Sequence, residues 1–197
     1  IAQGRVCNDF ELKAPARISV ITGSNMSGKS TFLRTVGLNL VLAYAGAPVC
    51  AAEFRCSRIR LWTCMRIADN LEKSISSFYA EIICIKQIVE AAQGEERVFF
   101  LLDEIFKGTN SFDRHQGAKA LIAQLEKAGA FGLISTHDLE LGELERESGG
   151  RIVNYHFREY YEDGQIRFDY KLRPGVSTTR NALYLIRLAG IEIDEHG

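Results

Sequence analysis

Hydrophobic and polar positions repeat with two different periods along this chain, and the two patterns alternate. Short stretches such as residues 97–104 are almost continuously apolar, as in strands that are buried on both faces of a parallel sheet. Longer stretches such as residues 29–46 repeat apolar residues every three or four positions, which indicates helices. The expected elements are strands at residues 16–22, 58–67, 97–104 and 130–136 and helices at residues 29–46, 76–92, 111–129, 137–147 and 178–190.

Residues 151–172 alternate with period two and contain Asp163-Gly164, a dipeptide typical of tight hairpin turns. We expect this late antiparallel hairpin at one edge of the sheet. The alternation of strands and helices before it predicts an α/β fold, with a mainly parallel central sheet and helices on both faces.

Composition narrows the class of protein. The chain has 197 residues, which suits one domain, and a net charge of −1, so the domain is not a polycation built to grip nucleic acid. Five scattered cysteines (Cys7, Cys50, Cys56, Cys64 and Cys84) show neither a CxxC pair nor zinc spacing, and their odd number predicts a reducing, cytoplasmic location. No apolar run reaches the roughly 20 residues of a membrane span. Without an initiator Met, residues 1–197 are expected to be the C-terminal part of a longer protein.

The segment "ITGSNMSGKST" joins the first expected strand to the first expected helix and fits the pattern G-x-x-x-x-G-K-[ST]. Glycine lets backbone N–H groups turn toward a phosphate, and the positive end of a helix adds to the attraction. The lysine would reach the β- and γ-phosphates of ATP and the serine hydroxyl would ligate Mg²⁺. The alternative is a glycine-rich turn that contains Lys-Ser by chance. The residues predicted to bind the nucleotide here are Gly23, Ser24, Asn25, Met26, Ser27, Gly28, Lys29, Ser30 and Thr31.

Two acids, Asp103 and Glu104, stand where the apolar strand "RVFFLLDE" ends. A carboxylate at that edge can hold Mg²⁺, and its neighbour can orient or deprotonate an attacking water. We assign Asp103, together with Ser30, to the metal and Glu104 to the water. Alone, the pair could also be two solvated acids that cap a strand.

His137 follows another apolar strand, in "GLISTHDLEL". Ligands of open α/β sheets lie beyond the carboxyl ends of the strands, so His137 could contact the γ-phosphate or the water. The alternative is a histidine at a helix start, with Thr136 or Asp138 as the N-cap. His115, His156 and His196 have no such setting and are expected to be ordinary surface residues.

Together, "ITGSNMSGKSTFLRTVG", "LLDEIFKGTNSFD" and "STHDLEL" resemble the ATPase domain of the MutS DNA mismatch-repair family, a branch of the ABC-type P-loop NTPases. The segment "RIADNLEKSISSFYAEI" is similar to the family's stretch that ends in Ser-Thr-Phe-Met-x-Glu, and "LRPGVSTTRNALYLIRLAGI" to its closing helix.

The resemblance implies an ATPase that dimerises with a second copy around ATP and Mg²⁺. Ser76 matches the signature serine that acts on the nucleotide of the other protomer, although "SISSF" could also be a helix N-cap. Val6, Cys7 and Asn8 fall in the segment that touches adenine in the family. DNA would be contacted by domains outside this chain.

Departures from the family pattern favour a divergent MutS-like branch: Ser24 replaces a usual Pro, Ser27 a usual Gly, and residues 106–109 read Phe-Lys-Gly-Thr for Gly-Arg-Gly-Thr.

The hypothesis is an ATPase that couples hydrolysis to DNA binding in mismatch repair. The alternatives are action on branched or recombining DNA and a nucleotide-gated scaffold with little hydrolysis. A transporter ATPase would need the signature Leu-Ser-Gly-Gly-Gln, which the sequence lacks.

Overall fold

The computed structural model describes residues 6–65, 77–162 and 165–177. It confirms a mixed α/β fold with a mainly parallel central sheet. The expected helix at residues 178–190 and the predicted signature residue Ser76 lie outside the described residues. In chain order the elements are β1 (Ile18–Thr22), α1 (Lys29–Tyr44), β2 (Arg60–Cys64), α2 (Ser77–Ala92), β3 (Val98–Asp103), α3 (Ser111–Lys127), β4 (Phe131–Ser135), the 3₁₀ helix η2 (Leu139–Glu143), α4 (Leu144–Glu147), β5 (Ile152–His156), β6 (Glu159–Glu162), β7 (Gln165–Phe168) and β8 (Arg173–Pro174).

The main sheet has the strand order β2-β3-β4-β1-β5-β8. Neighbouring strands from β2 to β5 are parallel, and β8 closes one edge in antiparallel orientation. The central strand β3 is buried on both faces, because Phe100 and Leu102 enter one hydrophobic core while Phe99 and Leu101 enter the other. This burial explains why its sequence is an unbroken apolar run.

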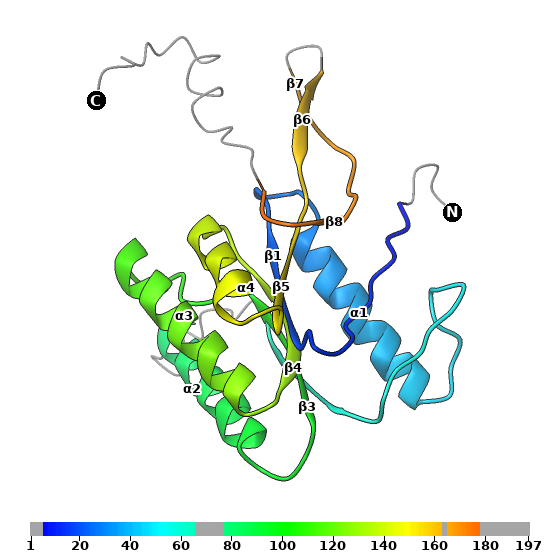
Figure 1. Cartoon of the computed structure of the whole chain (residues 1–197). Coiled ribbons are helices and arrows are strands. Elements are labelled where there is room, and N and C mark those ends of the chain that lie inside the picture. The colour runs from blue at the N-terminus through cyan, green and yellow to red at the C-terminus, as the bar shows by residue number, and fades with distance from the viewer. Residues whose placement is uncertain (1–5, 66–76, 163–164, 178–197) are drawn as a thin grey trace.

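Helices cover the two faces of the sheet, with α1 on one side and α2 and α3 on the other (Figure 1). α1 buries Leu33 and Leu40, whereas Ile88 of α2 and Ile122 and Leu125 of α3 fill the opposite core. Each fully buried side chain of this size stabilises the fold by about 1.5–3 kcal/mol. None of the described helices is both long enough and apolar enough to cross a membrane.

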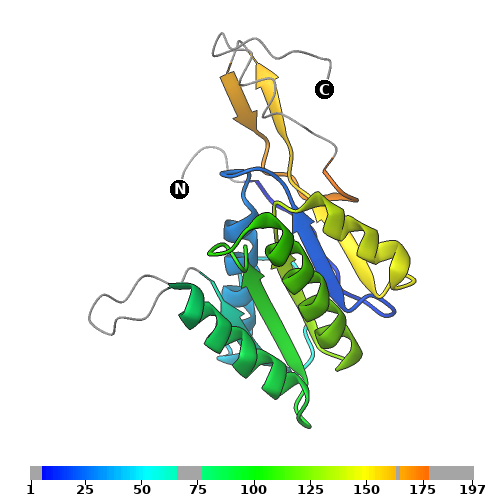
Figure 2. The same ribbon diagram turned by 90° about the vertical axis from the view of Figure 1, so that its left-hand side faces the viewer.

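The expected position of the hairpin at the edge of the main sheet is wrong. β6 and β7 form a separate two-stranded antiparallel sheet, which projects away from the main sheet (Figures 1 and 2), and the edge beside β5 belongs to β8. β5, read as part of the same alternating segment, instead pairs in parallel with β1. Ile152 and Asn154 of β5 are buried, whereas β7 is mostly exposed. The two apolar side chains of β7, Ile166 and Phe168, share one face of the strand but are not part of either core of the main sheet.

The strand order brings three sequence segments to one edge of the sheet. β3, β4 and β1 are neighbours, and at their carboxyl ends Asp103 pairs with Ser135 and Ser135 with Ile21. The segments that follow these strands start with Gly23, Glu104 and Thr136. Because parallel strands end together, side chains far apart in the sequence meet there.

Candidate functional site

The conformation of the loop between β1 and α1 depends on two glycines. Gly23 has φ 141° and Gly28 has φ 111°, conformations that L-residues with a side chain rarely adopt. Gly28 is also the N-cap of α1. A Cβ on Gly23 would lie 2.6 Å from the carbonyl oxygen of Phe157. The backbone can thus fold tightly around the start of α1 only because these positions lack side chains.

Lys29 is buried at the first position of α1, with 3% of its side chain exposed. Its Nζ donates to the carbonyl oxygens of Gly23 and Ser24, both at 2.8 Å, and lies 3.3 Å from Glu104 Oε1. Burial lowers the pKa of Lys29, and the attraction of Glu104 opposes that shift. The positive charge of the ammonium group is therefore compensated by the carbonyl oxygens of the loop on one side and by the Glu104 carboxylate on the other.

Ser30 and Asp103, the two predicted metal ligands, are in direct contact. Ser30 Oγ donates to Asp103 Oδ1 at 2.9 Å, and Ser135 Oγ donates to the same oxygen at 2.5 Å. Hydroxyl and carboxylate oxygens are the ligands that Mg²⁺ prefers. The pair supplies a suitable donor set for a hard divalent cation.

Glu104 and His137, predicted to act on water, are also in contact. His137 Nε2 lies 2.6 Å from Glu104 Oε1 and 3.0 Å from Asn25 Oδ1, so it donates toward two acceptors. Lys107 Nζ forms an ion pair with the other oxygen, Oε2. The hydrogen bond from His137 holds the pKa of Glu104 well below its usual range, assisted by Lys107 and Lys29 and opposed by burial.

The N-terminal segment, predicted to touch the base, is tied to the chain beyond the hairpin. Asn8 Nδ2 donates to the carbonyl oxygen of Tyr170 at 2.9 Å, and its Oδ1 accepts from the Leu172 N–H at 2.8 Å. Val6 and Asn8 line the same groove as the glycine loop, Asp103 and Glu104, with a cavity volume of about 2390 Å³. This volume exceeds the roughly 300–1,000 Å³ of a single-ligand pocket, so the convergent charges locate the candidate site better than the cavity does.

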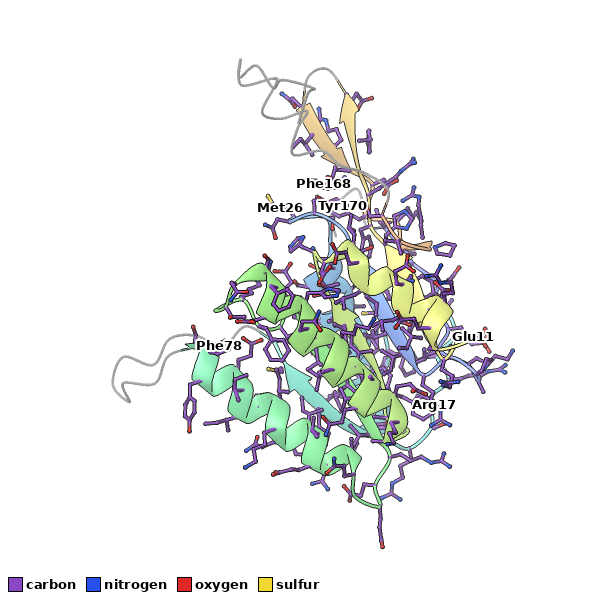
Figure 3. The ribbon with its side chains drawn as sticks, turned by 60° about the vertical axis from the view of Figure 1, so that its left-hand side comes forward. Glu11, Arg17, Met26, Phe78, Phe168 and Tyr170 are labelled. Atoms are coloured by element: carbon purple, nitrogen blue, oxygen red, sulfur yellow. The ribbon has the colours of Figure 1, made fainter. Side chains whose placement is uncertain are left out.

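Sequence reasoning missed three groups at this site. Tyr170 has φ 54°, and its ring lies 3.3 Å from the position of a Cβ on Gly28; Figure 3 shows it beside Phe168 near Met26. Glu159 accepts a hydrogen bond from Ser24 Oγ. Glu81 accepts one from the turn after Asp103. The sequence places Glu81 at the final Glu of the stretch that resembles Ser-Thr-Phe-Met-x-Glu but does not indicate its partner, and it carries no spacing signal for Tyr170 or Glu159.

Two histidines expected at the surface are instead half-buried and bonded. His115 Nδ1 lies 2.7 Å from Asp138 Oδ2, and His156 Nδ1 lies 2.9 Å from the Gly175 carbonyl oxygen. Asp138 also caps η2 by accepting from the Glu140 N–H. His137 therefore precedes the cap and lies outside the helix, where its Nε2 contacts Glu104.

The residues at the loop fit an anionic ligand with a divalent cation. Lys29, Ser30 and Thr31 occupy the first turn of α1, where backbone N–H groups have no acceptor within the helix. Ser27 Oγ is buried and has no hydrogen-bond partner among the described residues. With the hard oxygens of Ser30 and Asp103, these donors match a phosphate chain that carries Mg²⁺.

Residues 19–193 match the family model described as MutS domain V. The chain is 35% identical over 188 residues to the DNA mismatch repair protein MutS of Aquifex pyrophilus, covering 94% of this chain and 22% of that relative. It is 34% identical to the protein of the same name from Persephonella marina, covering 95% of this chain and 21% of that relative. It is 36% identical to DNA mismatch repair protein MutS 2 of Halobacterium salinarum, covering 95% of this chain and 22% of that relative. The chain thus spans about a fifth of the length of these relatives, and it belongs to the MutS domain V family.

Proposed function

We propose that this domain is an ABC-type P-loop NTPase that binds ATP with Mg²⁺ and hydrolyses it. The observation that supports this most is the convergence of Lys29, Glu104 and His137 within hydrogen-bond reach of one another, beside the contact between Ser30 and Asp103. A buried cation, a metal-type donor pair and a carboxylate with its histidine are the parts that phosphoryl transfer to water needs.

Each residue has a separate role in this proposal. The loop from Gly23 to Thr31 holds the phosphates through backbone N–H groups and Lys29, and Ser30 and Asp103 hold Mg²⁺, which neutralises phosphate charge. Glu104 orients the water and accepts its proton on a carboxylate oxygen. His137 Nε2 donates toward that carboxylate and keeps it in place.

The base would lie against the ring of Tyr170, next to Val6 and Asn8. Two observations support this placement: Tyr170 stands directly over Gly28, and Asn8 fixes its backbone. An aromatic face accepts a purine by stacking, which is worth about 1–3 kcal/mol per base.

The wider function follows from the family. The domain would dimerise with a second copy, so that Ser76 of each protomer acts on the nucleotide of the other. The relatives are named DNA mismatch repair proteins, and we propose the same role for the longer protein that contains this domain, with DNA bound by domains outside this chain. Action on branched or recombining DNA is the alternative.

A nucleotide-gated scaffold with little hydrolysis has one specific observation in its favour. Both carboxylate oxygens of Glu104 are already engaged, by His137 and Lys29 on one side and by Lys107 on the other. A carboxylate held at low pKa in this way is a weak base. Measured turnover of the wild-type domain separates the two possibilities.

The variant Glu104→Gln tests the proposed hydrolysis. It keeps the shape of the side chain and removes the base, so phosphate release should fall at least about 100-fold while Mg–ATP still binds. Glu96→Gln is the matched control, because Glu96 is an exposed carboxylate at the opposite end of β3 and should change neither property. Unchanged turnover in Glu104→Gln would exclude Glu104 as the base.

A further inference from the structure

Glu81 lies on the second turn of α2 and reaches across to the turn that follows Asp103. One of its carboxylate oxygens, Oε1, accepts the backbone N–H of Phe106 at 2.5 Å. Burial raises the pKa of Glu81, and this hydrogen bond opposes the shift. A half-buried carboxyl group is therefore hydrogen-bonded to the backbone two residues after Glu104.

The turn that Glu81 holds has an unfavourable backbone. Glu104 has φ 52° and Phe106 has φ 61°, so two nearby residues with side chains adopt the left-handed conformation. Such conformations persist only where surrounding contacts impose them. At one end the Glu104 N–H donates to the Ser135 carbonyl oxygen at 3.0 Å and to Ser135 Oγ at 3.1 Å. In the middle, Glu81 supplies the acceptor for Phe106.

A second contact from α2 fixes the far side of the same turn. A Cβ on Gly108 would lie 2.7 Å from Phe78 Cβ, so Phe78 packs directly on the backbone of the turn. Figure 3 shows Phe78 at the start of α2. The side chain of Phe106 packs against the core that lies under α2 and α3. The first turns of α2 thus contact the turn twice, through the hydrogen bond of Glu81 and the packing of Phe78.

The position of the turn decides where the Glu104 carboxylate lies. Glu104 and Phe106 are two residues apart, and Lys107, the next residue, pairs with Glu104 Oε2. If the Phe106 N–H loses its buried acceptor, the turn can relax and carry Glu104 and Lys107 with it. A displacement of about 1 Å at a catalytic group can reduce a rate about 100-fold.

We infer that Glu81 is a positioning residue for hydrolysis, which holds the Glu104 carboxylate in its productive place by accepting the Phe106 N–H. This inference rests on the proposed function, because it concerns the same reaction. Glu81 would touch neither the nucleotide nor the water. Glu81 lines the same groove as Lys29 and Ser30, but its Oε1 is hydrogen-bonded to the turn after Asp103, whereas the phosphates would be held by the glycine loop and Lys29, so nucleotide binding should not depend on Glu81.

The test compares Glu81→Ala, Glu81→Gln and the control Glu90→Ala in the 197-residue chain. Glu81→Ala removes the acceptor, so kcat should fall about 10- to 100-fold while KM for ATP stays within about twofold. Glu81→Gln keeps an acceptor oxygen of the same reach and should retain most of the activity. Glu90 is an exposed carboxylate on the same helix and its replacement should have no effect. Amide hydrogen exchange across residues 104–109 should become faster in Glu81→Ala alone.

The outcomes distinguish the inference from the proposed function. Normal kcat in Glu81→Ala, or equal losses in Glu81→Ala and Glu81→Gln, would overturn the inference while hydrolysis by the wild type stands. A wild-type chain that releases no phosphate would contradict both. If Glu81→Ala does not fold, Glu81→Asp replaces it: its carboxylate is one methylene shorter, so kcat and amide exchange must change in the same directions.

Discussion

Replacing Gly23 with alanine should destabilise the domain because the position excludes a side chain in two ways. Its φ of 141° is strained for any L-residue, at a cost of about 1–3 kcal/mol. The new Cβ would also lie 2.6 Å from the Phe157 carbonyl oxygen and 2.9 Å from Ser27 Oγ. Ser27 can rotate away, but Phe157 is fully buried and its N–H is bonded to Thr22, so its carbonyl cannot move freely. Overpacking adds about 1–3 kcal/mol, which gives a total of about 2–6 kcal/mol.

The matched control is Gly46→Ala at the end of α1. Gly46 has φ 71° and no atom within 4 Å of an added Cβ, so only the backbone strain of about 1–2 kcal/mol applies. Guanidinium denaturation followed by circular dichroism gives both free energies of unfolding. Gly23→Ala should be the more destabilised variant and should also bind Mg–ATP more weakly. Equal free energies in the two variants, with unchanged binding, would refute the argument that the loop depends on close approach at Gly23.

Two further predictions concern Glu104 and Tyr170. The pKa of Glu104 is lowered in the folded chain, chiefly by His137, so its stabilising contribution is complete above the ordinary value of 4.5 and is lost as the pH falls below it. The free energy of unfolding, measured by denaturation at pH 7, 5, 4 and 3, should fall with acid by at least about 1 kcal/mol less in Glu104→Gln than in the wild type. An equal fall in the two proteins would contradict this. Tyr170→Ala should weaken ATP binding by about tenfold through lost stacking and leave the binding of inorganic tripolyphosphate unchanged. Calorimetric titration compares the two ligands, and an equal loss for both would argue against a contact with the base.

The sequence predicted the central part of the site because its residues follow strands that end at one edge. Gly23, Asp103 and His137 each lie within two residues of the end of a parallel strand, and parallel neighbours bring such ends together. The contacts of Ser30 with Asp103 and of Glu104 with His137 agree with that expectation. The catalytic, metal and nucleotide roles of these residues stay predictions until they are measured.

The remainder of the site depends on contacts that periodicity does not encode. Tyr170 reaches the loop because Asn8, 162 residues earlier, binds its backbone. Glu81 matches the closing Glu of the family stretch Ser-Thr-Phe-Met-x-Glu, but that motif does not indicate its partner, a backbone N–H, which every residue except proline has. The hairpin was misplaced for a similar reason, since alternation predicts a strand but does not name its neighbour.

Nucleotide binding at the start of α1 is the central claim, and thermal unfolding with and without Mg–ATP tests it most directly. A ligand that binds only the folded chain raises the melting temperature. The wild type and Lys86→Met, which changes an exposed lysine on α2, should both be stabilised. Lys29→Met, which removes the buried ammonium group, should not be. A wild type that Mg–ATP leaves unshifted, or a Lys29→Met chain that shifts as much as the wild type, would contradict the account.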